Sequence, residues 1–153
     1  AAGGRRGMNW ARQMIGCLVA SALFARLFRT PARLIAPASV TAALGYALSV
    51  WAGAELGAEW AGIFLGSLVA ALIGEALATK LRAPATIFLT VAVIPMVPGA
   101  GLYNTMLALV QGRSADAAAA GSSTILAAGG IALGLSIAAS AAYAVRRARK
   151  GRN

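Results

Sequence analysis

The chain has 153 residues, of which 59% are hydrophobic and 12% are charged, and its mean hydropathy is +0.75. Soluble domains carry about 25% charged residues, so this chain has too few charges to cover a water-facing surface, and a soluble globular protein is excluded. The formal net charge of +10 does not indicate nucleic-acid binding, because the basic residues lie at the ends of apolar segments. The composition predicts an integral membrane protein with one domain over residues 1–153.

Five apolar stretches are candidate membrane segments, since roughly 20 helical residues cross ~30 Å of hydrocarbon. The apolar runs are continuous and lack the alternation of barrel strands, which predicts helices. The predicted fold class is all-α, a polytopic membrane helix bundle of about five transmembrane segments. These are residues 13–28, 34–52, 58–78, 84–111 and 122–145, followed by a basic tail at 146–153.

The basic residues also predict the orientation of the chain. Connections rich in Lys and Arg alternate with connections that lack an excess of them, and basic loops face the cytoplasm. We therefore expect the C-terminus to be cytoplasmic, where the basic tail could also contact anionic lipid head groups. The cytoplasmic connections are 29–33, 79–85 and 146–153, and the outer ones are 53–60 and 112–121.

The first segment, 13–28, does not fit this alternation cleanly. Full crossing would leave three arginines on the outer side: Arg5, Arg6 and Arg12. The start of the chain could be non-native, with Met8 as the true start, or the segment could enter the membrane without crossing. A signal peptide that ends near the "ASA" at 20–22 is a third alternative.

The second segment carries hydroxyl groups that could either bond across helices or line a path. They accompany a proline and a glycine within ten residues: Pro37, Ser39, Thr41, Gly45 and Tyr46. Both alternatives remain open from the sequence.

The third segment has small residues at every fourth position, which predicts a stripe for close helix packing. The stripe is Gly62, Gly66, Ala70, Gly74 and Ala78. Ser67, Ala71 and Glu75 lie along the neighbouring face, and the fifth segment repeats the pattern with Gly130 and Gly134.

Glu75 is the one carboxylate deep inside a predicted segment, on the same side of the membrane as Arg26. It could form a structural ion pair or extend towards the interface. Alternatively, it could bind and release protons and so couple transport to the proton gradient.

The fourth segment, 84–111, is interrupted near its middle. Pro95 has no N–H for the carbonyl of Val91, and Pro98 has none for Ile94. Unpaired polar groups cost several kcal/mol at this depth, and Gly99 and Gly101 follow with freer backbone conformations. We therefore predict a helix broken at Pro95–Gly101, with halves at about 85–96 and 100–111.

Such a break would expose the N–H groups and positive dipole end of the second half to a small carboxylate. A simple proline kink is the alternative. On the second half, Gly101, Asn104, Ala108 and Gln111 form one small or polar face that should turn away from lipid. The candidate substrate-binding residues are Pro95, Pro98, Gly99, Gly101, Tyr103 and Asn104.

The side chains needed for metal binding or covalent catalysis are not present as a set. The chain has no histidine and a single cysteine, Cys17, and no two acids lie close together within a segment. We predict no metal site, no cofactor and no enzymatic activity.

The stretch "VAVIPMVPGAGLYNTM", residues 91–106, resembles the second-half (YjjB-type) membrane domain of the threonine/serine exporter (ThrE) family. The motif matches Ile94, Pro95, Met96, Pro98, Gly99 and Tyr103. The "LFRTPARLIAPA" junction at 27–38 and the order of the segments also agree. The resemblance extends over about residues 12–147.

The resemblance implies export of small carboxylate-bearing metabolites across a bacterial inner membrane. Threonine, serine or a dicarboxylate such as succinate are the expected substrates. It also implies a second membrane subunit that resembles the first half of the family, and a homo-oligomer is a further possibility. A non-transporting membrane scaffold or assembly subunit is the alternative.

Overall fold

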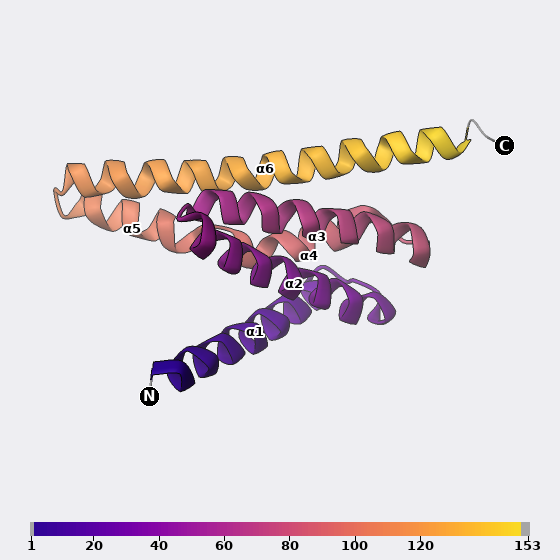
Figure 1. Cartoon of the computed structure of the whole chain (residues 1–153), viewed down its shortest axis with the longest axis horizontal. Coiled ribbons are helices and arrows are strands. Elements are labelled where there is room, and N and C mark those ends of the chain that lie inside the picture. Colours follow the sequence, from indigo (N-terminus) through magenta and orange to yellow (C-terminus); the bar gives the residue numbers. More distant parts are fainter. Residues whose placement is uncertain (1, 151–153) are drawn as a thin grey trace.

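The computed structural model describes the backbone of residues 2–150 and the side chains of residues 12–148. About 90% of the chain is helical, and the described residues contain no strand, which confirms the all-α prediction (Figure 1). The elements are α1 (Ala2–Leu27), α2 (Ala32–Leu56), α3 (Glu59–Leu81), α4 (Ala85–Val93), the short 3-10 helix η1 (Ile94–Met96), α5 (Gly99–Val110) and α6 (Ser114–Lys150).

Within the described residues, three helices are long and apolar enough to cross a membrane, namely α2, α3 and α6. Counted together, Ala85–Met96 and Gly99–Val110 are a fourth candidate span, bent by 44° at its break, which agrees with the predicted broken helix. The first predicted segment is helical as α1 but is not among these spans. Its crossing of the membrane therefore stays a prediction.

Helix α6 is longer than the predicted segment 122–145, because it begins at Ser114 and continues into the basic tail. The alanines at 117–120 favour helix. Asp116 lies in the first turn, where a carboxylate stabilises the helix dipole, and it forms a 2.8 Å ion pair with Arg113. Side chains in the tail beyond residue 148 lie outside the described residues.

Helices α2 and α3 form an antiparallel hairpin held by the predicted stripe of small residues. A side chain at Gly66 would meet the carbonyl oxygen of Gly45 and the Cβ of Ser49, so the two backbones are in near contact there. All five residues of the stripe are buried. Since lipid is as apolar as leucine, this close packing, rather than burial from water, holds the helices together.

The neighbouring face of α3 packs against α6. A side chain at Gly134 would meet Ser67 and Leu68, and one at Gly130 would lie 3.0 Å from the carbonyl oxygen of Trp60. The predicted packing role of the two glycines in α6 is thereby confirmed. Helix α3 is consequently the central element, in contact with α2, α4 and α6.

Two turns at one end of the bundle have matching sequence and backbone. They read R-T-P-A at 29–32 and R-A-P-A at 82–85, and their arginines adopt positive φ angles of 54° and 50°. A hydrogen bond closes each turn. The N–H of Thr30 donates to the carbonyl of Ala25 at 2.9 Å, and the N–H of Ala83 donates to the carbonyl of Ala78 at 3.0 Å. At the opposite end, the left-handed positions are filled by Gly57 and Gly112.

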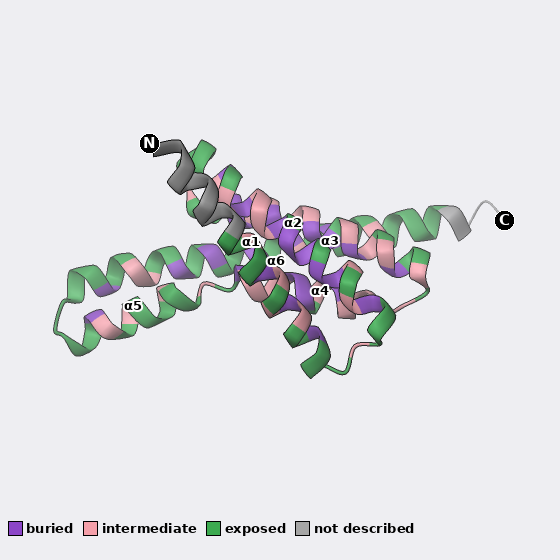
Figure 2. Ribbon diagram, turned by 90° about the horizontal axis from the view of Figure 1, so that it is seen from below, coloured by how far each residue is buried: buried purple, intermediate pink, exposed green. Residues whose placement is uncertain are grey.

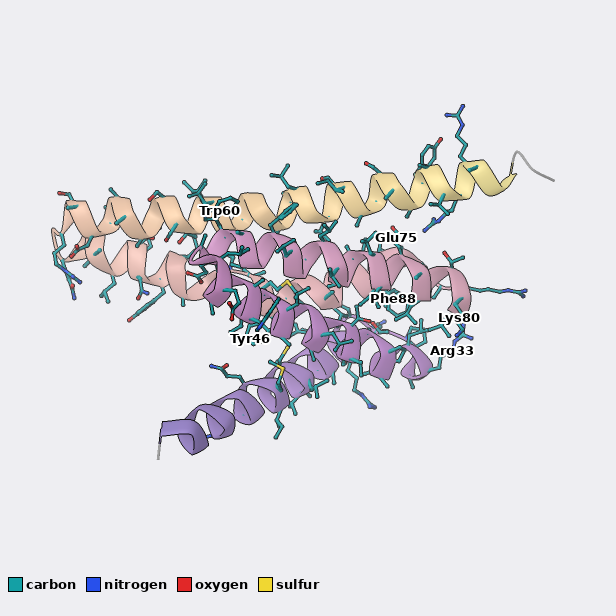
Figure 3. The ribbon with its side chains drawn as sticks, in the orientation of Figure 1. Arg33, Tyr46, Trp60, Glu75, Lys80 and Phe88 are labelled. Carbon is teal, nitrogen blue, oxygen red and sulfur yellow. The ribbon has the colours of Figure 1, made fainter. Side chains whose placement is uncertain are left out.

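The two ends of α3 are a membrane thickness apart. Trp60 and Lys80 are separated by about 30 Å of helix, which equals the hydrocarbon thickness of a bilayer. Figure 3 places Lys80 beside the start of α2 with Arg33, and Trp60 towards the other end. Beyond Trp60, α5 and the first part of α6 continue together as a projecting hairpin (Figures 1 and 2).

The substitution Gly62→Ala should destabilise the fold by about 1–3 kcal/mol, because the new methyl group would overlap backbone atoms of Ser49 and Gly53. Gly129→Ala is the matched control, since nothing lies within 4 Å of its added methyl group. It should be neutral or raise stability by up to about 1 kcal/mol, because alanine favours helix over glycine. Thermal unfolding of the purified chain in detergent measures both, and equal melting temperatures would contradict the packing described here.

Candidate functional site

The fourth span is interrupted by five residues, Ile94 to Pro98, that do not continue the α-helix. Helix α4 ends at Val93, η1 forms one turn, and α5 begins at Gly99. The N–H of Val97 donates to the carbonyl of Ile94 at 3.4 Å, and the N–H of Gly99 donates to the carbonyl of Val97 at 2.7 Å. These local bonds replace part of the pairing that the prolines remove.

The N-terminus of α5 retains unpaired donors. The first bond of the new helix runs from the N–H of Leu102 to the carbonyl of Pro98, at 3.1 Å. Helix geometry leaves the N–H groups of Ala100 and Gly101, which precede it, without acceptors in the helix. The predicted exposed helix end is therefore present, although α4 ends at Val93 instead of 96 and α5 begins at Gly99 instead of 100.

The reason predicted for the two glycines is wrong. Neither Gly99 nor Gly101 has a positive φ angle, so the backbone at these two positions does not require glycine. A side chain at Gly101 would collide with the hydroxyl group of Thr124, whereas one at Gly99 would meet nothing within 4 Å. Gly101 thus allows α5 to approach α6, and Gly99 leaves space open.

A cleft of about 460 Å³ lies at the break, between the second half of α2, the start of α3, the start of α5 and the first part of α6. This volume is in the range of small-ligand sites. The residues that line the cleft are Tyr46, Ser49, Val50, Glu59, Ile63, Pro95, Met96, Val97, Pro98, Gly99, Ala100, Gly101, Asn104, Ala120, Ser123, Thr124 and Ala127.

Most of the predicted substrate-binding residues line this cleft. They are Pro95, Pro98, Gly99, Gly101 and Asn104. Tyr103 does not line it and is 67% exposed on another face of α5. On the face predicted to turn away from lipid, Ala108 is buried and Asn104 borders the cleft.

Several polar residues of the cleft were missed by the sequence analysis, because they come from other helices. Ser123 and Thr124 lie at the edge of the predicted fifth segment, and Ser49 lies one turn after Tyr46. The hydroxyls of Ser49, Ser123 and Thr124 donate to carbonyls of their own helices at 2.7–2.9 Å, which leaves their lone pairs free to accept from a ligand. The position of Tyr46 favours the path-lining alternative.

The cleft is closed towards the Arg33 and Lys80 end of the bundle. Met96 is buried, and its methyl group packs against Gly45. Towards that end lies a buried apolar cluster made by α1, α2, α3 and α4, which includes Phe88 (Figure 3). The cluster comprises Ala25, Leu34, Ala38, Ala42, Ala78, Phe88 and Val91.

Comparison with known proteins assigns the chain to a family. The family described as "Threonine/Serine exporter, ThrE" matches residues 13–141. This chain belongs to the ThrE family. No curated protein and no solved structure matches it. The match covers the broken fourth span and every residue that lines the cleft, so the chain is a threonine/serine exporter-type membrane protein.

The intramembrane carboxylate of this ThrE protein, Glu75, has a partner in Arg146 of α6. Arg146 donates to the carboxylate of Glu75, and the side chains are 55% and 12% exposed, respectively. The ion-pair alternative is thereby supported. Glu75 does not line the cleft, and its role in proton coupling stays a prediction.

The described residues of this ThrE protein offer no set of metal ligands. No group of three or more His, Cys, Asp or Glu side chains comes together in residues 12–148. The cleft presents hydroxyl, amide and backbone N–H groups, which suit reversible binding of a polar solute.

The substitution Glu75→Gln distinguishes the two roles of this carboxylate. Glu75→Gln leaves Arg146, which is 55% exposed, whereas Arg146→Gln leaves the carboxylate of Glu75, which is only 12% exposed, without its partner. Arg146→Gln should therefore lower stability more than Glu75→Gln. We expect the pH dependence of threonine export to be the same in both variants as in the unsubstituted chain when all three are measured. A profile that flattens in Glu75→Gln alone would assign proton coupling to Glu75.

Proposed function

We propose that the chain is a subunit of a secondary exporter of small carboxylate-bearing metabolites, such as threonine, serine or a dicarboxylate like succinate. It acts in the bacterial inner membrane together with a second membrane subunit that resembles the first half of the family. Its cytoplasmic end carries the two matching arginine turns and the basic end of α6. Membership of the ThrE family supports the exporter class.

The observation that carries the proposal is the cleft at the helix break. The first N–H groups of α5 border it, and they bring the positive end of the helix dipole to the membrane interior. A carboxylate that lost its hydration on entering the cleft would regain hydrogen bonds from these donors. Hydroxyl and amide groups on the other walls would bind the remaining polar atoms of the substrate.

Transport requires that the cleft open in turn to each side of the membrane. The apolar cluster around Phe88 closes the cytoplasmic half, whereas Glu59 and Ser123 line the cleft towards the opposite side. This arrangement supports a state open to the outer side. Export then needs the packing of α4 against α2 and α3 to loosen, so that substrate can enter from the cytoplasm.

A non-transporting scaffold is the second candidate. Large apolar side chains on the projecting hairpin are 53–87% exposed, which would suit assembly with another membrane chain. They include Leu102, Met106, Leu109, Ile125 and Leu126. In this role the prolines would only shape the bundle, and filling the cleft would not change transport.

The substitution Gly99→Leu tests transport directly. A Cβ added at position 99 meets nothing within 4 Å, and the rest of the leucine side chain would project into the cleft beside the first N–H groups of α5. We expect export of labelled threonine, from cells that express both subunits, to fall at least about tenfold, as for loss of a well-placed polar contact. Gly129→Leu is the control, because it also meets nothing within 4 Å but lies outside the cleft. Normal export by Gly99→Leu at equal membrane abundance would refute the assigned site.

A further inference from the structure

Glu59 is the one charged side chain among the residues that line the cleft. It occupies the first turn of α3, where the helix dipole stabilises a negative charge. Among the described residues, the ion pairs are Arg113 with Asp116 and Arg146 with Glu75, so no described cation pairs with Glu59. A carboxylate that borders a ligand-sized space without a cation of its own is available to a ligand.

The charges around the cleft match one class of substrate better than another. The start of α5 contributes a partial positive charge, and Glu59 contributes a full negative charge. No Lys or Arg lines the cleft in the described part of the chain. A dicarboxylate would bring two negative charges and would have only one favourable partner, while Glu59 would repel it. A zwitterion brings one charge of each sign.

We propose that Glu59 receives the ammonium group of the substrate and makes the cleft selective for zwitterionic amino acids over dicarboxylates. The inference rests on the proposed function, since it assigns a second charged group, the carboxylate of Glu59, to the same site. The ammonium group donates charge-assisted hydrogen bonds to the carboxylate of Glu59. The hydroxyl of a threonine or serine side chain is then left for the polar walls, formed by Tyr46, Ser49, Asn104, Ser123 and Thr124.

Glu55 provides a matched control for this assignment. It lies four residues earlier, carries the same charge and is exposed like Glu59, but it does not line the cleft. Glu55→Gln and Glu59→Gln therefore change the net charge of the same end of the bundle equally. Only Glu59→Gln removes a charge from the cleft, so a general effect of surface charge would be equal in both variants.

The first measurement is equilibrium binding of labelled threonine to the purified full chain in lipid nanodiscs, with competition by succinate and by N-acetylthreonine, which lacks the ammonium group. We expect the unsubstituted chain to prefer threonine over both competitors. Glu59→Gln should weaken threonine binding roughly five- to tenfold and leave succinate binding unchanged or stronger. Glu59→Asp should recover part of the loss, and Glu55→Gln should behave like the unsubstituted chain.

The second measurement is export of threonine and succinate by cells that express both subunits. Equal loss of both substrates in Glu59→Gln, an unchanged ratio, or no threonine binding to the purified chain would overturn the assignment. If threonine binds with the expected preference but neither substrate is exported, the assignment of Glu59 holds and the exporter function fails. If both substrates are exported normally and Glu59→Gln does not change their export, the role of Glu59 is refuted and the exporter function stands.

Discussion

The pairing of backbone polar groups inside a membrane governs this structure. Helices α3 and α6 contain no proline, so the N–H and C=O groups in their interiors can pair along the helix, and α2 has one proline, Pro37, near its start. The fourth span departs from this rule at Pro95 and Pro98, and two local hydrogen bonds restore part of the pairing. The donors left over at the start of α5 are the reason that a polar cleft exists among apolar helices.

Small residues determine where that cleft lies. The glycines of α3 bring α2 so close that Met96 fills the space beside Gly45 and closes one side of the break. On the other side, Gly101 faces Thr124 and Gly121 faces Thr105, so α5 lies along α6 instead of continuing beside α2. The divergence of α5 from α2 opens the cleft, and its walls come from four helices.

The local features of the fold followed from the sequence, whereas the composition of the site did not. Two prolines in a long apolar run predicted the broken helix, and the four-residue spacing of Gly62, Gly66 and Gly74 predicted the packing face. Each of these signals lies within a single segment of the sequence. Glu59 and Thr124 enter the site only because α3 and α6 pack in a particular register, and Arg146 reaches Glu75 for the same reason. Tyr103 belongs to the recognised motif, yet the rotation of α5 turns it out of the cleft.

The interlocked contact between α5 and α6 has a mechanical consequence. Thr124 occupies the space beside Gly101, and Thr105 lies against Gly121, 3.3 Å from an added methyl group. Sliding or separating the two helices would therefore open voids in two places. Helix α5 and the first turns of α6 should therefore move together, and because α6 continues unbroken into its contact with α3, their angle can change only if α6 bends along with the residues between Val93 and Gly99. The width of the cleft is then controlled by this coupled bending, which a contact made far out on the projecting hairpin can adjust.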